Sequence, residues 1–431
     1  MKDLLNRHFE KLEKQVDVKL KNEYASLVNF SRRHFHPIHR WFYYHEAFSP
    51  ELIEKVIENY CGPKNGSVID PFNGGGTTTL VSALNGLDSI GLEVNPFSYF
   101  LSTVKCQQYS PKDVVSIRKG IDQLKPISKK KKKYDVPALS IIDRLFDAPV
   151  LKELLSFKAE IYAIENKKVR DFLMLGWLCI LERVSNYRKG GNGLKKRPRS
   201  ASEKNAREQL FVQLDLMLAD VECLIGQKTY KHFIKPELKY LNCVNNFPQL
   251  EQKFDLAVFS PPYLNCFDYF EVYKIELWMG DFVNSYDQLR QLRRNTLRSH
   301  LNATFESELS GENNFIKIIE PIFSYLKGQK LWDKKIPSMV WFYFEDMFRV
   351  LKNLSTILKP NGVCVIVIGN SAYANAVIPV DVLLATLSME AGFECEAIDV
   401  ARRNETSSQQ HKNLGSSSKY LRESLVILRR K

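Results

Sequence analysis

The amino-terminal part of the chain shows the alternation of apolar and charged positions that is typical of amphipathic helices. Residues 1–35 predict one or two such helices. Another helix is predicted from Ser49-Pro50, because serine is a good N-cap and proline suits the first helical position. It continues through 51–60 and ends near Gly62-Pro63.

A strand, a glycine-rich turn, a helix and a second strand then follow in close succession. Residues 67–69 form a short apolar strand that ends in the turn 70–76, and the helix after this turn ends at Gly86. The next strand, 89–93, ends on an acidic residue. This succession is typical of the opening of a doubly wound, Rossmann-like α/β sheet.

The α/β pattern is interrupted twice. From 109 to 235 the sequence is helical and charged, and 281–335 is polar and loop-rich. Three further strands are predicted from apolar runs, at 254–259, 362–370 and 424–430. We therefore expect one α/β domain with two insertions. The α/β domain comprises 1–108, 236–285 and 336–431. The two basic insertions are 109–235, which is helical, and 286–335.

Composition places the chain among globular proteins. Of its 431 residues, 44% are hydrophobic and 26% are charged, and no apolar run approaches the roughly 20 residues of a membrane helix. The first residues lack the apolar core of a secretory signal. None of the eight cysteines forms a C-x-x-C pair, so we expect reduced thiols in a cytoplasmic protein, with no metal site and no membrane partner.

Basic residues outnumber acidic ones, which favours a polyanionic partner. The formal net charge is +13 and the pI is about 9.1. Two clusters of basic residues are suited to contact phosphates. For each, the alternative is that its side chains are simply exposed to solvent. The first contains Arg188, Lys189, Lys195, Lys196, Arg197 and Arg199. The second, at spacings predicting one helix face, contains Arg290, Arg293, Arg294 and Arg298. The run 129–133 is interpreted as a charged linker.

The glycine-rich turn has the features of a cofactor-binding loop. Glycines directly after a strand allow a tight turn and close approach to a ligand, and the helix from Thr77 offers free N–H groups to an anion. Glu93 ends the next strand, where a carboxylate can hold ribose hydroxyls. No Gly-Lys-Ser/Thr follows, and position 79 is threonine, so neither a P-loop nor a dinucleotide motif fits. A nucleoside with a carboxylate tail fits better than either, and S-adenosylmethionine has that shape. A purely structural turn is the alternative.

The second candidate motif is Ser260-Pro261-Pro262-Tyr263, directly after the buried strand 254–259. Two prolines fix the backbone and remove two donors, which leaves the Ser260 hydroxyl and the Pro261 carbonyl as a rigid pair of acceptors. Such a pair could hold both hydrogens of an exocyclic amine, and Tyr263 could stack on the flipped base. A proline-rich turn without chemistry is the alternative.

Together these motifs resemble those of the DNA amino-methyltransferases of restriction-modification systems. In that family a D-P-F-x-G-x-G-T-T loop binds the cofactor and an (S/D/N)-P-P-(Y/F/W) motif holds the target amine; here they stand at 70–78 and 260–263. Residues 48–51 resemble the family's F-S-P-E segment. The resemblance covers roughly 36–105 and 236–431. It implies a S-adenosylmethionine-dependent methyltransferase sheet whose cofactor residues are Phe48, Ser49, Asp70, Pro71, Phe72, Gly74, Gly76, Thr77, Thr78 and Glu93.

Two features depart from the family pattern. The glycine motif precedes Ser260–Tyr263 by more than 180 residues, whereas many relatives have the reverse order. The acid expected at the adenine ring of the cofactor is absent, and Asn242 takes its approximate place among the cofactor residues.

The resemblance implies double-stranded DNA as substrate and a restriction endonuclease as a partner encoded alongside. Serine at the first motif position is commoner among cytosine-N4 enzymes, so methylation of cytosine N4 is preferred over adenine N6. Two alternatives stay open: an RNA base amino-methyltransferase, and a non-catalytic DNA-binding subunit on a methyltransferase scaffold.

Overall fold

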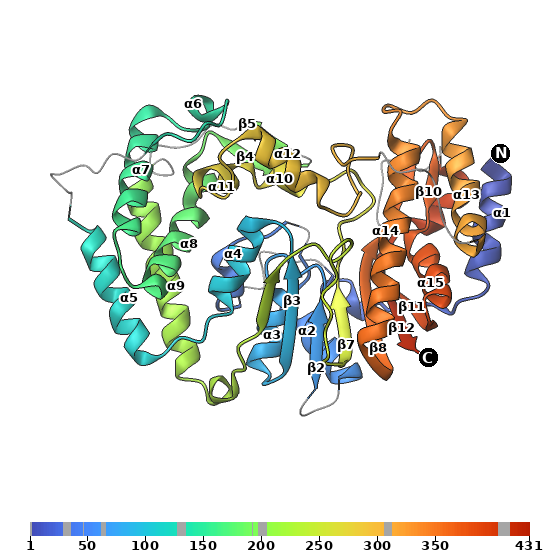
Figure 1. Ribbon diagram of the computed structural model, residues 1–431, viewed down its shortest axis with the longest axis horizontal. Coiled ribbons are helices and arrows are strands. Elements are labelled where there is room, and N and C mark those ends of the chain that lie inside the picture. Colours follow the sequence, from blue (N-terminus) through green and yellow to red (C-terminus); the bar gives the residue numbers. More distant parts are fainter. Residues whose placement is uncertain are drawn as a thin grey trace.

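An eight-stranded sheet runs through the centre of the computed structural model (Figure 1). The structure describes residues 2–28, 36–45, 47–61, 66–126, 135–191, 193–196, 205–305, 313–403 and 414–431. In spatial order the strands are β1 (Val18–Leu20), β11 (Phe393–Arg403), β12 (Arg422–Arg430), β8 (Leu358–Gly369), β7 (Phe254–Phe259), β2 (Ser67–Asp70), β3 (Asp88–Glu93) and β6 (Glu237–Tyr240).

The strand directions are those of a doubly wound fold. The five strands from β8 to β6 are parallel to one another, and β12 is antiparallel to both of its neighbours. The chain passes from β2 outward to β3 on one side, while β7 and β8 continue the sheet on the other. Ligands of such sheets bind at the carboxyl edge where the order reverses, here between β2 and β7. The prediction of a doubly wound α/β sheet is confirmed.

Both faces of the sheet are buried, which explains why its central strands are continuous apolar runs. In β8, alternate residues enter two different cores: Val365 packs with α2 (Pro50–Tyr60), and Ile366 packs with α14 (Ile336–Ile357) and α15 (Val380–Glu390). Helix α2 begins as predicted, with Ser49 accepting a hydrogen bond from the backbone N–H of Leu52 and proline at the first position.

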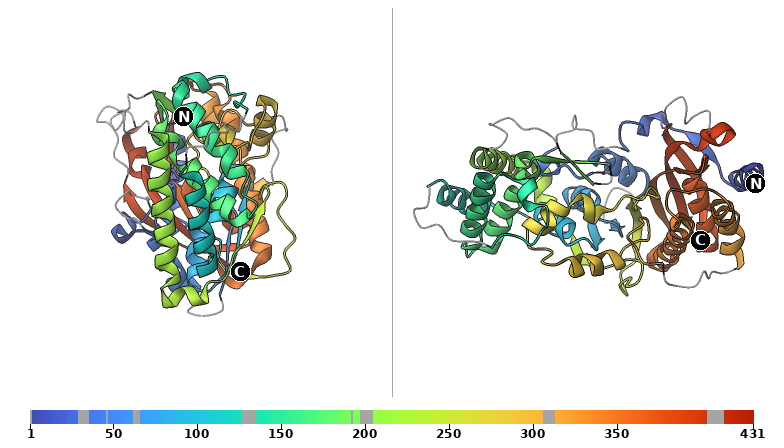
Figure 2. Two further views of the ribbon diagram at one scale, coloured as in Figure 1. Left: turned by 90° about the vertical axis from the view of Figure 1, so that its left-hand side faces the viewer. Right: turned by 90° about the horizontal axis from the view of Figure 1, so that it is seen from above.

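The segment 109–235 forms a helical group at one end of the molecule (Figure 2). It contains α5 (Pro111–Leu124), α6 (Ile142–Leu145), α7 (Ala148–Tyr162), α8 (Lys167–Val184) and α9 (Ala206–Ile225), together with a hairpin of β4 (Tyr187–Gly190) and β5 (Gly193–Lys196). Helix α8 packs against α4 (Pro96–Lys105) and α11 (Lys274–Met279), so the group shares a core with elements of the α/β domain. The hairpin carries the described residues of the first basic cluster, in a segment predicted to be helical.

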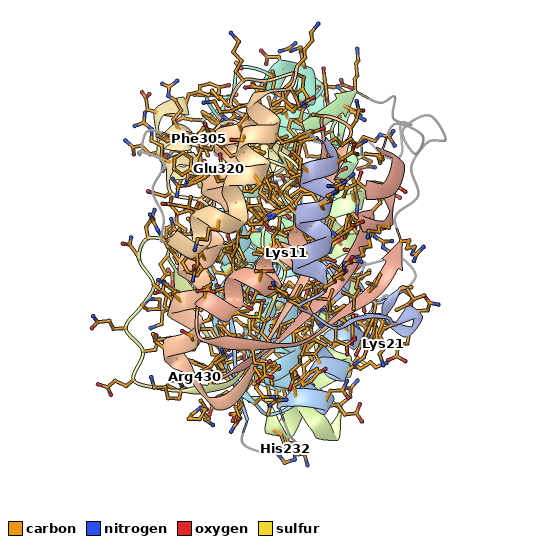
Figure 3. All side chains as sticks on the ribbon, turned by 90° about the vertical axis from the view of Figure 1, so that its right-hand side faces the viewer. Lys11, Lys21, His232, Phe305, Glu320 and Arg430 are labelled. Carbon is orange, nitrogen blue, oxygen red and sulfur yellow. The ribbon has the colours of Figure 1, made fainter. Side chains whose placement is uncertain are left out.

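The opposite end is built from α1 (Lys2–Glu13), α13 (Asn313–Lys327), α14 and α15. Figure 3 looks onto this end, where α1, which carries Lys11, stands beside α13, which carries Glu320. Arg430, at the end of β12, lies below them. Among the helices of the described ranges, none has both the length and the apolar character that crossing a membrane requires.

Two regions contain elements that were not predicted from the sequence. Within 1–35, α1 is followed by strand β1, which extends the sheet by pairing in parallel with β11. The polar, loop-rich region 281–335 also contains α12 (Tyr286–Arg294), where a helix face was predicted, and α13, where no helix was predicted. Helix α13 buries apolar residues at helical spacing, and this amphipathic pattern outweighs its internal Pro321.

Candidate active site

A pocket of about 950 Å³, including its open mouth, lies at the carboxyl edge of the sheet. Four strands bring their ends to it: Asp70 ends β2, Glu93 ends β3, Asn242 follows β6, and Ser260 follows β7. Because these are the parallel strands flanking the switch point, the pocket occupies the place where doubly wound sheets bind ligands. Both motifs singled out from the sequence therefore meet in one cavity.

The turn after β2 needs glycine at two positions. Gly74 and Gly76 have φ angles of +48° and +78°, which side chains rarely tolerate. A Cβ at position 76 would also lie 2.8 Å from the Cβ of Ser102. At position 74 it would lie 3.2 Å from the ring of Tyr44, which covers the turn. The loop is thus tightly held, with its backbone close to the pocket.

Two carboxylates organise this loop. Asp70 accepts a hydrogen bond from the N–H of Phe72 at 2.8 Å, and Glu93 accepts from the N–H groups of Gly74 and Asn95, both at 2.7 Å. Burial raises the pKa of Asp70 and that of Glu93 to about 7 in each case. Each carboxylate keeps unused lone pairs, so both can accept further hydrogen bonds from a ligand that displaces solvent.

Three amide side chains in the pocket wall, those of Asn73, Asn95 and Asn242, carry unused donors. The side-chain oxygen of Asn242 accepts from the N–H of Val244 at 2.7 Å, and that of Asn95 accepts from the N–H of Phe97 at 3.0 Å. The Nδ2 of each is buried and has no hydrogen-bond partner among the described residues. Buried donors without partners are costly, so this pocket is suited to a ligand that presents acceptors.

The predicted cofactor residues divide into two groups. Those that line the pocket are Phe48, Asp70, Pro71, Phe72, Gly74, Thr77, Glu93 and Asn242. Ser49, Gly76 and Thr78 lie behind the wall: Ser49 caps α2, Gly76 shapes the turn, and Thr78 is buried with its hydroxyl directed at the carbonyl of Val258. These three support the site without lining it.

The Ser260–Tyr263 motif divides in the same way. Ser260 and Pro262 line the pocket, whereas Pro261 and Tyr263 are not in its wall. The Tyr263 hydroxyl donates a 2.8 Å hydrogen bond to Glu423, whose carboxylate also pairs with Arg402. The ring packs against Gly369, where a Cβ would approach it to 3.0 Å. The hydrogen bond to Glu423 and the packing on Gly369 therefore both fix the orientation of the Tyr263 ring.

The pocket also contains residues that sequence reasoning missed. Tyr44 and Tyr269 line it and stack with ring centroids 6.3 Å apart, and Tyr44 stacks on Tyr273 at 4.9 Å. A second missed group follows α12 and comprises Thr296, Leu297, Ser299 and His300. No local pattern marks Tyr44 or His300, since long-range packing brings them to the site.

Lys189 does not belong to a DNA-facing surface, which corrects one sequence-based prediction. Its side chain is 1% exposed and forms an ion pair with the fully buried Glu276, with Glu182 at 3.4 Å. Its ammonium group also lies over the rings of Phe42 and Tyr273. Such a cation fixes β4 to α11 and cannot reach a phosphate.

The prediction that four arginines share one helix face is also wrong. Helix α12 ends at Arg294, and Arg298 lies in the loop beyond it, where it binds both Asp346 and Glu345 of α14. Arg293 is ion-paired with Asp268 and Glu271, each at 2.8 Å. The side chains of Arg293 and Arg298 are only 14% exposed, so internal carboxylates already occupy them.

The remaining described members of the two clusters are exposed. Arg188, Lys195 and Lys196 lie on the β4–β5 hairpin, where Arg188 and Lys195 are directly opposite each other. Strand β5 packs against α10 (Tyr269–Val272), whose first two residues line the pocket. Arg294 is exposed on α12, as is Arg290, which pairs with Asp287. Arg197, Arg199 and the run 129–133 fall outside the described residues.

Comparison with known proteins gives consistent matches. A family model described as DNA methylase matches residues 5–103. The Type II methyltransferase M.AvaI of Nostoc sp. is 29% identical over 423 residues, which cover 89% of this chain and 85% of the relative. M.BsoBI of Geobacillus stearothermophilus is 26% identical over 452 residues, covering 93% and 87%. M.MvaI of Kocuria varians is 22% identical over 405 residues, covering 88% and 86%. Similarity to Type II methyltransferases therefore extends across nearly the whole chain.

Proposed function

Because this chain belongs to the DNA amino-methyltransferase family, we propose that it methylates the exocyclic amine of one base within a specific DNA sequence, with cytosine N4 preferred over adenine N6. One observation carries the proposal: the glycine loop after β2 and Ser260 after β7 line the same pocket. The preference for cytosine rests on serine as the first residue of the motif.

The residues of the pocket fit S-adenosylmethionine, which supplies an electrophilic methyl group when bound. Glu93 has lone pairs left for the two ribose hydroxyls, and the N-terminus of α3 (Thr77–Leu84) attracts a carboxylate. The Nδ2 of Asn242, which has no partner among the described residues, suits an acceptor nitrogen of adenine, whereas an acid in this place would accept from the amino group of adenine. Phe48 supplies an apolar wall for the ring.

Ser260 and Pro261 perform the positioning that the reaction needs. The lone pair of an exocyclic amine is delocalised into its base, which makes the nitrogen a poor nucleophile. Acceptance of its two hydrogens by the Ser260 hydroxyl and the Pro261 carbonyl draws the nitrogen toward tetrahedral geometry and directs its lone pair at the methyl group. Catalysis is then mainly positioning, without a covalent intermediate.

The target base reaches this pocket by rotating out of the duplex. Tyr263 lies just outside the wall of the pocket, and its ring, which Gly369 and Glu423 hold in place, stacks on the base there. Outside the pocket, the duplex lies along the carboxyl edge of the sheet, where the exposed cations of the β4–β5 hairpin contact phosphates. Of the two insertions, the one that carries α12 reads bases.

A restriction endonuclease of the same sequence specificity is the expected partner, since the relatives are named Type II methyltransferases. The cytoplasm, near the nucleoid, is the expected location.

Incubation of the protein with labelled S-adenosylmethionine and with either plasmid DNA or RNA, followed by nucleoside mass spectrometry, tests the proposed function. Formation of N4-methylcytosine in DNA would support the proposed function in full. Formation of N6-methyladenine in DNA would change only the identity of the target base. Methylation of RNA alone would establish the RNA alternative. Binding of DNA without methylation of either nucleic acid would identify a non-catalytic subunit.

A further inference from the structure

The turn between α13 and α14, residues 328–335, exposes a tryptophan among lysines. Trp332 is 72% exposed, more than any other large hydrophobic side chain of the described residues. Lys330 and Lys334 lie on either side of it in the sequence, are exposed, and form no ion pair with another described residue. An accessible aromatic ring between cations suits a nucleic acid, whose phosphates attract the cations and whose bases present flat faces.

Two contacts place this turn beside the pocket. The Nζ of Lys335 donates to the carbonyl of Leu301 at 3.3 Å, and Leu301 directly follows His300, which lines the pocket. The carbonyl of Lys335 accepts from the N–H of Met339 at 2.8 Å, and the sulfur of Met339 lies 3.6 Å from that of Cys266, just beyond the Ser-Pro-Pro-Tyr motif. The turn is therefore held against the pocket wall and against the chain that leaves the motif.

The turn stands on the same side of the sheet as the other surfaces proposed to face DNA. Helix α14 leads without a loop into β8, so its end lies at the amino edge of the sheet and its beginning toward the carboxyl edge. Figure 1 shows the turn at the top of the molecule, with the β4–β5 hairpin toward the other side and α12 between them. A duplex with one base in the pocket can therefore contact the hairpin and the turn together.

We propose that the turn 328–335 is a further DNA-binding surface, at which Lys330 and Lys334 contact phosphates and Trp332 stacks on a base beside the one that leaves the duplex. This inference rests on the proposed function. Rotation of one base out of the duplex uncovers the faces of its neighbours, and an indole ring on such a face replaces the stacking that is lost. Stacking on an aromatic ring tolerates every base, so the turn adds affinity without changing which sequence is recognised.

The fluorescence of Trp332 itself provides the test. The chain has five tryptophans, all within the described residues, and the other four are at most 4% exposed. Acrylamide should therefore quench mainly Trp332 in the free protein, and Trp332→Phe should lack this accessible emission. A duplex that contains the mapped methylation site, added with S-adenosylhomocysteine, should remove the accessible emission from wild type.

Affinity measurements separate the stacking from the phosphate contacts. Trp332→Ala should raise the Kd for this duplex by about 5- to 100-fold, and Trp332→Phe should raise it less, because phenylalanine still stacks. The double variant Lys330→Ala and Lys334→Ala should lower the slope of log K against log salt by about 0.9 for each phosphate contact that is lost. The preferred sequence should be the same in all of these variants.

The matched controls are Val212→Ala and Lys231→Ala. Val212 is 56% exposed on α9, and Lys231 is exposed beside His232, which is labelled at the bottom of Figure 3. Both controls should bind DNA as wild type does, and thermal unfolding should show that all variants fold.

Unchanged access of acrylamide to Trp332 in the DNA complex would overturn the inference, while DNA methylation by wild type would leave the proposed function intact. Protection of Trp332 that grows with protein concentration in the absence of DNA would also overturn it, by assigning the turn to a contact between two copies of the chain. Absence of DNA methylation by wild type would instead contradict the proposed function.

Discussion

Ser260 is the residue on which the proposed chemistry depends most directly. Ser260→Ala removes one of the two amine acceptors while leaving the glycine loop and Glu93 in place. We expect turnover to fall by about 100-fold, since misplacing a reacting group by about an ångström has effects of this size. The Kd for S-adenosylmethionine, measured by calorimetry, should stay within about twofold. A full methylation rate in Ser260→Ala would contradict the role of an amine acceptor.

We expect Glu93 to make the affinity for the cofactor depend on pH. Its pKa is raised to about 7, so in the ligand-free protein the carboxylate is formed above that pH and protonated below it. Ribose hydroxyls donate to the ionised form, and affinity should therefore be full near pH 8 and lost as pH falls through 7. We expect the Kd for S-adenosylmethionine to rise about tenfold between pH 8 and pH 6, because each unit below the pKa costs about 1.4 kcal/mol.

Glu93→Gln and Glu93→Ala separate this effect from that of Asp70, whose pKa is also raised to about 7. Glu93→Gln should bind more weakly at pH 8 and show a smaller change with pH, with only the contribution of Asp70 remaining. Glu93→Ala should weaken binding by about 1–3 kcal/mol at pH 8. An unchanged pH profile in Glu93→Gln would show that Glu93 does not contact the cofactor.

Cys266 follows the catalytic motif closely but should not act as a nucleophile. Its thiol is buried, lies 3.6 Å from the sulfur of Met339 and 3.4 Å from the hydroxyl of Tyr373, and has its pKa raised by burial. A raised pKa suppresses the thiolate that attack on a base would need. Cys266→Ser should therefore keep most methylation activity. Complete loss of activity in a variant that folds normally would contradict this packing role.

At the scale of elements, the sequence predicts those whose pattern is strong and local. The strands β2, β3, β7 and β8 and the start of α2 follow from apolar runs and capping residues. Strand β1 has only three residues and is partly exposed, so its place depends on pairing with β11, some 380 residues along the chain. Helix α13 was missed because Pro321 and polar neighbours hide an apolar face that only packing reveals.

The candidate site likewise divides into residues that local sequence patterns reveal and residues that only long-range packing reveals. Its motif residues lie in two short segments and could be found from residue type and spacing. Charge was a poorer guide, because sequence alone does not distinguish an exposed cation from a paired one. The partner of Lys189 is 87 residues away in the chain, and Arg298 binds carboxylates 47 and 48 residues away. Tyr44 and His300 were not predicted as site residues for the same reason, since contacts between distant parts of the chain bring them to the pocket.

The β4–β5 hairpin should supply affinity for DNA without supplying sequence preference. Neutralising Arg188, Lys195 and Lys196 together removes three exposed cations beside α10. Binding should weaken uniformly across sequences, and the slope of log K against log salt should fall by about 0.9 for each phosphate that the hairpin no longer neutralises. Fluorescence anisotropy at several salt concentrations measures this. An unchanged slope would show that the hairpin does not bind phosphates.

At the scale of the whole molecule, α12 connects the helical group to the pocket at the carboxyl edge of the sheet. The hydroxyl of Tyr286, at its start, contacts the Ser140 side chain at 2.7 Å, and the segment after its end lines the pocket through Thr296 and His300. Figure 1 shows α12, α10 and the hairpin above the carboxyl ends of the central strands. If one base of a duplex enters the pocket, as proposed, we expect the duplex to pass beside α12, whose exposed arginines can enter a groove.

We therefore expect α12 to read bases through Arg294, with Arg290 as a second reader. Arginine binds guanine in the major groove, and removing such an arginine relaxes specificity at one position at a cost of about 1–3 kcal/mol. Methylation of a randomised-site library by wild type, Arg294→Ala and Arg290→Ala, read by sequencing, measures this. Lys196→Ala is the matched control, because removing a phosphate-binding cation weakens all sites alike. If Arg294→Ala and Arg290→Ala also weaken every site without changing preference, α12 contacts only the backbone and recognition moves to the helical insertion 109–235.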